Sequence, residues 1–237
     1  MPDAPTGTTP LRVMSTLAVM GVLQELLPAR EQATGGRIIA AFGPTATLLG
    51  RIKAGETADL TILTAEAIDA LIAAGTLRAG SRVDMAVSVV GVAVRAGAPR
   101  PEIGTPEAFR QALLAARTIA YSRAGASGIF FAGLIERLGI AAEVNAKATV
   151  IPQGFTAELA ARGEVELAIQ QVSELMTVPG VDIVGPLPEA INTRAVFSAG
   201  IFANSPAPEA AAALLRHLIE AGTPALLAAK GLLPASA

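Results

Sequence analysis

The sequence predicts an α/β protein of two lobes, with mostly parallel sheets and two long strands that cross between the lobes. Short apolar runs alternate with segments of helical spacing, which is typical of parallel strands joined by helices. The segments 83–97 and 193–205 are long, rich in β-branched residues and free of helix signals. If these two segments form a hinge, residues 1–85 and 198–237 make lobe I, and residues 86–197 make lobe II. A chain of 237 residues is long enough for two such lobes.

The remaining elements follow from the spacing of apolar residues. Strands are predicted at residues 11–15, 37–42, 59–63, 117–121, 147–151 and 165–170. Helices are predicted at residues 17–28, 46–54, 65–74, 106–115, 127–138, 156–162 and 206–220. Thr105 and Ser205 each precede a proline, so we expect both hydroxyls to cap a helix whose first turn contains that proline.

The balance of charge argues against a nucleic-acid partner. The chain has 18 basic and 20 acidic residues, a net charge of -2, and no long run of either sign. Proteins that bind nucleic acid carry a basic patch or stripe, and none is visible in this sequence. We therefore expect no nucleic acid among the partners.

The chain contains no cysteine and one histidine, His217, in a segment of helical spacing. Without cysteine, disulfides, thiolate nucleophiles and sulfur-ligated metals are excluded. A site with several histidine ligands is impossible within one chain. We expect the protein to use no metal and no cofactor.

Two further expectations concern membranes and location. No stretch approaches the roughly 20 uninterrupted apolar residues of a membrane span, so we expect no integral membrane segment. The first residues, "MPDAPTGTTPLRV", lack the basic and apolar regions of a secretory signal. The chain as it stands is thus expected in the cytoplasm, or in the periplasm if a signal sequence is missing from it.

Small polar residues gather where the predicted strands end and the next helix begins. Ligands of open α/β sheets bind at these carboxyl ends, where free backbone N–H groups and the helix dipole favour an anion. Each hydroxyl taken singly is more often an ordinary helix cap, including those of "FGPTAT" (42–47). As a set, the strand ends predict a site for a small anion. The candidates are Ser15, Thr16, Thr45, Thr47, Arg123, Ser127, Gln153, Gln170 and Gln171.

Two features of this set go beyond capping. Gln170 and Gln171 are neighbours at the end of an apolar strand, so their side chains point to opposite faces. At least one of them must find a polar partner or face a cleft. Arg123 lies in a loop of small residues and is suited to bind a carboxylate through two hydrogen bonds, although a surface position is the commoner fate of an arginine.

Several stretches resemble the type II periplasmic solute-binding proteins, in particular the molybdate-binding-protein-like branch. They are "LRVMSTLAVMGVLQELLP", "FGPTATLLGRIKAGETADLTILT", "YSRAGASGIFFAGLIERLGI" and "GEVELAIQQVSELMTVPGVDIVGPLP". The resemblance covers nearly the whole chain, and it implies two α/β lobes with the ligand in the cleft between them. Carried over by position, its ligand contacts fall near residues 15–18 and Phe155, and at Thr45, Ser127 and Gln171.

This sequence departs from the pattern of the molybdate binders. The serine of the first loop is Ala18, the serine-rich second loop is "GPTAT", and Gln171 stands where the family has a tyrosine. These changes favour an organic acid over a tetrahedral oxyanion. The resemblance therefore implies a protein that closes on a small carboxylate and delivers it to an ABC permease if it is exported.

An enzyme on the same fold is the alternative, because function resides in the site and not in the fold. Some members of this branch resemble aconitate isomerase, which moves a double bond within a tricarboxylate by proton transfer. Such a reaction needs an anion clamp and one acid or base close to an allylic carbon. The titratable candidates near strand ends are Tyr121, Lys147 and Glu174, each with an alternative structural role.

Overall fold

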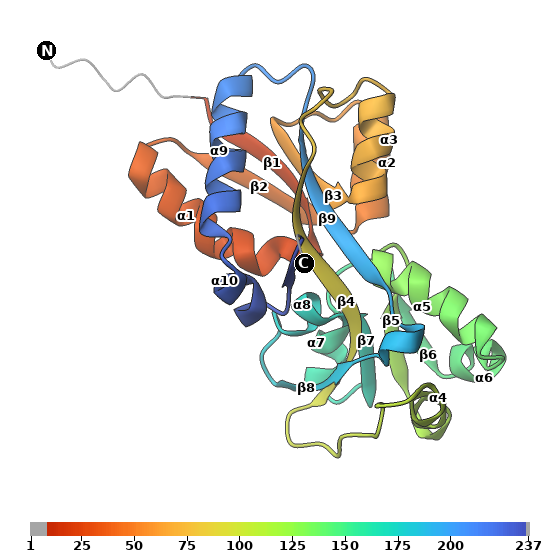
Figure 1. The fold of residues 1–237 in the computed structure, drawn as a ribbon. Helices are drawn as coiled ribbons and strands as arrows, with labels where there is room; N and C mark the ends of the chain where they lie inside the picture. The colour runs from red at the N-terminus through yellow and green to blue at the C-terminus, as the bar shows by residue number, and fades with distance from the viewer. Residues whose placement is uncertain (1–8, 236–237) are drawn as a thin grey trace, which may run out of the picture.

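A ten-stranded sheet runs through the protein in the order β2-β1-β3-β9-β4-β7-β5-β6, with β8 and β10 also pairing with β4. The computed structural model (Figure 1) describes residues 9–235. The sheet is divided between two lobes, each centred on its own parallel strands. In the first lobe these are β1 (Leu11–Thr16), β2 (Ile38–Gly43) and β3 (Leu60–Thr64). In the second lobe they are β5 (Ile119–Ser122), β6 (Ala148–Ile151) and β7 (Leu167–Gln171).

The long strands β4 (Val83–Arg95) and β9 (Arg194–Ile201) join the lobes, as Figure 1 shows. They pair with each other antiparallel. β9 also pairs with β3, and the far half of β4 pairs with β7 and with β8 (Val181–Pro186). The short strand β10 (Leu233–Pro234) adds to β4 near the middle of that strand. The two predicted crossing strands are thus present.

The register of these strands brings the carboxyl ends of both parallel sheets together. Thr64 at the end of β3 pairs with Phe197, which pairs with Ala86 of β4. Gln171 at the end of β7 pairs with Val90 of β4. β3 runs in the same direction as β4, and β7 runs in the opposite direction. The carboxyl ends of the two parallel sheets therefore face each other, separated by four residues of β4. At roughly 3.3 Å per residue this is about 13 Å.

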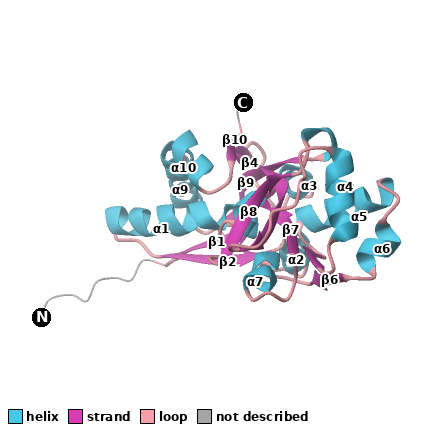
Figure 2. Cartoon of the chain, turned by 90° about the horizontal axis from the view of Figure 1, so that it is seen from below, coloured by secondary structure: helices cyan, strands magenta, loops and turns pink. Residues whose placement is uncertain are grey.

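Helices cover both faces of the sheet in each lobe. Those of the first lobe are η1 (Leu17–Val19), α1 (Met20–Thr34), α2 (Thr45–Lys53), α3 (Ala65–Ala73), α9 (Pro208–Ala221) and α10 (Pro224–Ala229). Those of the second lobe are α4 (Pro106–Ala115), α5 (Ala126–Arg137), α6 (Ala141–Asn145), α7 (Thr156–Ala161) and α8 (Val172–Leu175), with η2 (Glu189–Ile191) before β9. In Figure 2 the helices α1, α9 and α10 lie at one end of the molecule, and α4, α5 and α6 lie at the other.

Each lobe has its own apolar cores. In the first lobe, one core packs α1 and α9 on the sheet around Leu23 and Phe197, and another packs α2 and α3 around Leu48. In the second lobe, one core contains Phe131 of α5, and the other lies under α7. Apart from Ala86, Ala195 and Phe197, which lie on β4 and β9 at the boundary of the lobes, none of these four clusters combines residues of both lobes.

The structure corrects several predicted elements. The helix predicted at 17–28 begins as a 3-10 turn and continues to Thr34. The last long helix begins at Pro208 and not at residue 206, and Ala207 is its N-cap. Ser205 is not this cap, because its hydroxyl donates to Asp59 Oδ1 (2.6 Å) and accepts from the N–H of Ala207. The helices α6, α8 and α10 and the strands β8 and β10 were not predicted. The Thr105 cap is confirmed, since its Oγ1 accepts from the N–H of Ala108.

The side chain of Asn192, just before β9, forms hydrogen bonds that fix the start of β9 to β4. Its Nδ2 donates to the carbonyl oxygens of Val90 and Leu187, and its Oδ1 accepts from the N–H groups of Val90 and Thr193. Both connections between the lobes are therefore fixed to each other at the level of Val90.

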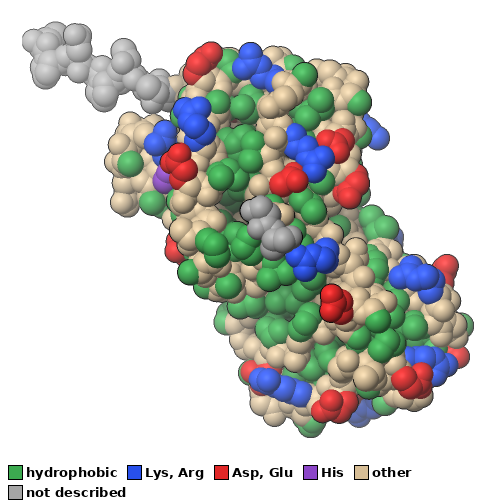
Figure 3. Space-filling model, viewed as in Figure 1, with side chains coloured by type: hydrophobic (Ala, Val, Ile, Leu, Met, Phe, Trp, Pro, Cys, Tyr) green, Lys and Arg blue, Asp and Glu red, His purple; other side chains and the backbone are tan. Residues whose placement is uncertain are grey.

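Within residues 9–235, none of the helices has the length and apolar character required to cross a bilayer. On the face shown in Figure 3, basic and acidic side chains are interspersed, and no continuous basic stripe crosses it.

Candidate functional site

Buried polar groups without a hydrogen-bond partner mark the place where the two sheets end. Four residues at or just beyond the ends of β2, β5 and β7 carry such groups: Thr45 (Oγ1), Ser122 (Oγ), Ser127 (Oγ) and Gln171 (Oε1 and Nε2). We call these four residues the strand-end set. Buried polar groups in proteins are nearly always paired, so several unpaired groups at strand ends indicate a missing partner. Within residues 9–235, the other buried side-chain atoms without a partner belong to Thr61, inside β3, and His217 on α9.

The strand-loop-helix turn after β2 positions Thr45. Pro44 is the N-cap of α2, and Thr45 is the first residue of that helix. The Thr45 hydroxyl has no hydrogen-bond partner, and the residue is 9% exposed. The first N–H groups of a helix have no partner within the helix, so α2 begins with free donors beside this hydroxyl.

The turn after β5 is unusually tight, and it buries two serines. A Cβ on Gly128 would lie 1.7 Å from the carbonyl oxygen of Ser122, and one on Gly125 would lie 2.8 Å from Ser122 Oγ. At Gly128 only glycine lets the first turn of α5 lie on the end of β5, because the atom that a Cβ would meet there is backbone. The turn holds Ser122 and Ser127 almost fully buried, with both hydroxyls unpaired.

Gln170 and Gln171 point to opposite faces, as predicted from their adjacent positions in a strand. Gln170 holds the loop before α7 in place. Its Oε1 accepts from the N–H and Oγ1 of Thr156, and its Nε2 donates to the carbonyl of Gly154. Gln171 is 1% exposed and is the N-cap of α8, where its side chain forms a capping box with Glu174. No hydrogen bond of its amide meets the usual limits of distance and angle. Gln171 shares its face of β7 with Ile169, which packs in the core that contains Phe131 of α5.

The loop after β1 leads into a contact of the first lobe with the second. Ser15 and Thr16 are buried, and Ser15 Oγ donates to the carbonyl of Thr16. The next turn, η1, contacts α8, and α1 also contacts α8. The segment after β1 therefore lies beside the segment after β7.

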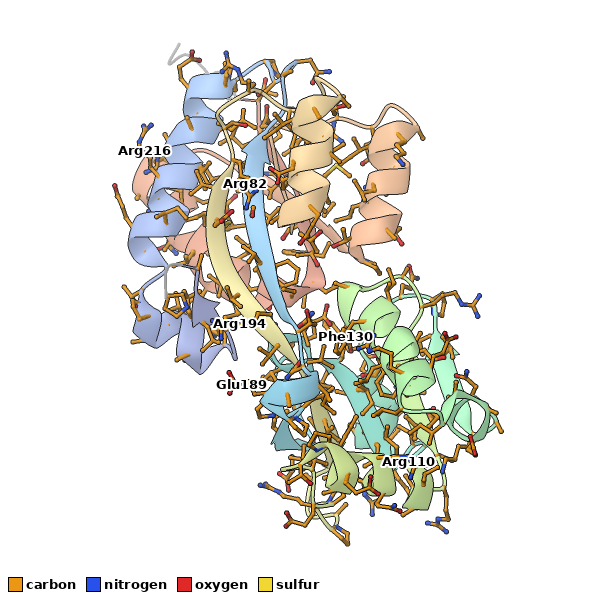
Figure 4. All side chains as sticks on the ribbon, turned by 45° about the vertical axis from the view of Figure 1, so that its right-hand side comes forward. Arg82, Arg110, Phe130, Glu189, Arg194 and Arg216 are labelled. Carbon is orange, nitrogen blue, oxygen red and sulfur yellow. The ribbon has the colours of Figure 1, made fainter. Side chains whose placement is uncertain are left out.

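Other residues from the sequence prediction lie differently. Thr47, Arg123 and Gln153 are exposed, and Phe155 is half-buried. Phe130 of α5 and Arg194 at the start of β9 lie near the junction of the lobes (Figure 4), and Arg194 pairs in register with Val89. Sequence reasoning singled out neither of them.

The three titratable candidates have different surroundings. The hydroxyl of Tyr121 donates to Asn145 Oδ1 (2.7 Å), and Lys147 Nζ donates to the carbonyl of Leu114. Both are thus engaged within the second lobe. Glu174 lies in α8 one turn beyond Gln171, is 5% exposed, and its Oε2 accepts from the N–H of Gln171 at 3.3 Å. Burial raises the pKa of Glu174 to about 7, against the lowering effect of hydrogen bonds from the Gln171 N–H and the Gln170 side chain.

The strand-end set consists of hydroxyls and an amide, without a metal-binding cluster. Residues 9–235 hold no group of three or more His, Asp or Glu side chains placed to share a metal ion. A separate hollow of about 540 Å³ lies at the far end of the second lobe, lined in part by Arg95, Arg100 and Arg117, and no member of the set borders it. Neutral donors at helix starts are suited to hold a small anion between the lobes.

Sequence reasoning did not list Ser122 among the site residues, although the signal was present. Ser122 is the last residue of β5, directly before the glycine-containing turn. Its burial depends on how closely Gly128 packs on it. That distance is a property of the folded turn and cannot be read from the letters.

Comparison with known proteins places this arrangement in a family. Residues 11–233 match the bacterial extracellular solute-binding proteins. The chain belongs to this family, as the resemblance in its sequence predicted.

The relatives include both an enzyme and binding proteins. An aconitate isomerase from a Pseudomonas species is 37% identical over 235 residues, covering 97% of this chain and 89% of the relative. The periplasmic molybdate-binding protein of Azotobacter vinelandii is 18% identical, with a TM-score of 0.77 over 94% of this chain and 98% of that chain. The sulfate-binding protein of Mycobacterium tuberculosis H37Rv is 17% identical, with a TM-score of 0.77 over 97% of this chain and 88% of that chain. The two structures confirm the two-lobed fold.

Proposed function

We propose that this protein binds a small organic carboxylate between its lobes, at the strand-end set. The observation that carries the proposal is the group of five buried, unpaired polar atoms on Thr45, Ser122, Ser127 and Gln171. A carboxylate accepts hydrogen bonds from hydroxyls, from an amide and from the free N–H groups at the starts of α2 and α5. Leaving such groups buried without a partner costs about 1–3 kcal/mol each, which a bound ligand relieves.

The family suggests how such a binding protein is used. We propose that, when exported, it acts in the periplasm and delivers its ligand to an ABC permease. We also propose that the lobes divide near residues 85 and 197, so that closure is a rotation about β4 and β9. Asn192 supports this division, because it fixes both connections at one level.

The binding proposal predicts a rise in melting temperature with the right acid. A thermal-shift screen of di- and tricarboxylates, molybdate and sulfate should find an organic acid that stabilises the protein. Thr45→Ala should lower the affinity for that acid about tenfold, because it removes one buried hydrogen bond to an anion. Thr47→Ala, exposed in the same helix, is the matched control and should bind as the unaltered protein does. If no organic acid gives a response, or if molybdate or sulfate gives the strongest one, the proposal is wrong.

A second function, isomerisation of an unsaturated carboxylate, is favoured by Glu174 and by the aconitate isomerase relative. A general acid or base works best when its pKa lies near the working pH, and burial raises the pKa of Glu174 to about 7. In such a reaction Glu174 takes a proton from the carbon next to the double bond. The electron pair shifts across the allylic system, and a proton returns at the other end. No oxidant, reductant or metal is needed for this step.

The enzymatic proposal predicts exchange with solvent. In deuterated water, trans-aconitate mixed with the protein should gain deuterium at its allylic carbon or yield the cis isomer, followed by NMR. Glu174→Gln keeps an acceptor for the Gln171 N–H, so it should retain binding and lose at least about a hundredfold in rate. An unchanged rate of exchange in this variant would exclude Glu174 as the base. Absence of exchange in the unaltered protein would exclude this isomerisation and leave ligand binding as the proposed function.

A further inference from the structure

The hollow of about 540 Å³ at the far end of the second lobe has no part in the proposed function. It lies among the loop after β4, the end of α4 and the segment that leads into β7. Figure 1 shows the loop after β4 at the bottom of the view, on the side of the second lobe away from the first. A molecule in this hollow would therefore occupy a site separate from the strand-end set.

The walls of the hollow are mostly apolar, and part of them is stiff. The lining includes Pro99 and Pro101 of the loop after β4, Ala112 and Ala115 of α4, and Val165 before β7. The ring of each proline fixes the backbone angle φ, so this side of the hollow is formed before any ligand arrives. Binding sites for small molecules are commonly hollows of about 300–1,000 Å³ with apolar walls and a few polar groups. The size and lining of this hollow match that description.

Three arginines border the hollow, and two of them are paired with acids. Arg117 Nε donates to Glu166 Oε1 (2.6 Å), and Arg100 Nη2 lies 3.5 Å from Asp182 Oδ2. Among residues 9–235, no carboxylate forms an ion pair with the third arginine, Arg95. The hollow therefore has one positive charge without a partner, beside apolar walls.

The guanidinium of Arg95 lies against the wall of the hollow. Its Nη1 is 3.5 Å from the point where a Cβ of Gly163 would lie, and Gly163 is itself part of the lining. The backbone beside Arg95 is fixed, because the N–H of Ala96 donates to the carbonyl of Gly180 (2.9 Å). A guanidinium binds a carboxylate through two parallel hydrogen bonds. Arg95 can do so here without breaking an existing ion pair.

We propose that this hollow is a second binding site, for a small monocarboxylic acid with an apolar body. The carboxylate binds the guanidinium of Arg95, and the apolar body packs against the two prolines and the end of α4. A single negative charge matches the single unpaired positive charge. A di- or tricarboxylate carries further charges for which the hollow has no unpaired partner. The two sites thus take acids of different kinds.

Two probes of this class, 3-phenylpropionate and hexanoate, test the proposal. We would measure their affinities for the full chain by calorimetry, and at least one of them should bind. The amide of that acid has the same shape and no charge, so it should bind at least about tenfold more weakly. Arg95→Gln should lower the affinity for the acid by a similar factor. Ala115→Phe, at the exposed end of α4, should also lower it, because the ring fills the hollow.

Arg78→Gln is the matched control, because it removes an exposed arginine of the first lobe that does not border the hollow. It should bind the acid as the unaltered protein does, and the melting temperature of each variant checks that it is folded. The proposal is overturned if neither acid binds, or if Arg95→Gln and Ala115→Phe bind the acid unchanged. A loss of affinity in Thr45→Ala equal to that in Arg95→Gln would also overturn it, because the acid would then bind at the strand-end set.

Discussion

Gly128→Ala should destabilise the second lobe by about 3 kcal/mol or more and abolish ligand binding. The new Cβ would lie 1.7 Å from the carbonyl oxygen of Ser122 and 2.6 Å from its Oγ. The first of these atoms is backbone, so α5 would have to move off the end of β5. That movement would displace Ser122 and Ser127 together. Chemical denaturation measures the first effect, and the thermal-shift response to an acid measures the second.

Gly133→Ala in the same helix is the control for this substitution. Its Cβ would meet only the end of the Arg137 side chain, at 3.5 Å. Alanine is a better helix former than glycine, so this variant should be unchanged or about 0.5–1 kcal/mol more stable. Equal stability of the two variants would show that the turn after β5 is not as tight as described.

Stability should fall as the pH rises through 7, because of Glu174. The folded-state pKa of Glu174 is about 7, above the ordinary value of 4.5, because the side chain is buried. Between these values the folded protein keeps a proton that the unfolded chain has released, so raising the pH favours unfolding. The free energy of unfolding should therefore drop by about 2.5 kcal/mol from pH 5 to pH 8.

Glu174→Gln should remove most of this pH dependence, measured by denaturation at several pH values. The carboxyl groups of Glu56, Asp84 and Glu166, whose pKa values are lowered by neighbouring arginines, act in the opposite direction and below this range. Glu158→Gln, exposed on α7, should keep the slope of the unaltered protein. An unchanged slope in Glu174→Gln would mean that another group carries the effect.

Much of the fold could be predicted from the sequence, because the apolar runs that form β1 to β7 and β9 are separated by strong helix signals. The missed elements are of another kind. The helices α6 and α8 have five and four residues, too few for a helical period to show. The start of α9 was misplaced because both Pro206 and Pro208 can begin a helix. The choice between them depends on Asp59, which is remote in sequence and binds Ser205.

The candidate site shows the same division. The sequence shows that polar residues lie at the ends of the predicted strands. It also shows that the side chains of Gln170 and Gln171 point to opposite faces. Which of them are buried is not visible. Thr45 and Thr47 lie in the same turn of α2, yet one is buried without a partner and the other is exposed. Only the packing of α2 on the sheet decides between them.

The near-complete separation of the cores in the two lobes would give the proposed ligand a role in stability as well. Apart from Ala86, Ala195 and Phe197 at the boundary, no apolar cluster of residues 9–235 combines residues of both lobes. A ligand bound to Thr45 on one side and to Ser127 and Gln171 on the other joins the two cores by hydrogen bonds. The cooperativity of unfolding then depends on the concentration of a small molecule.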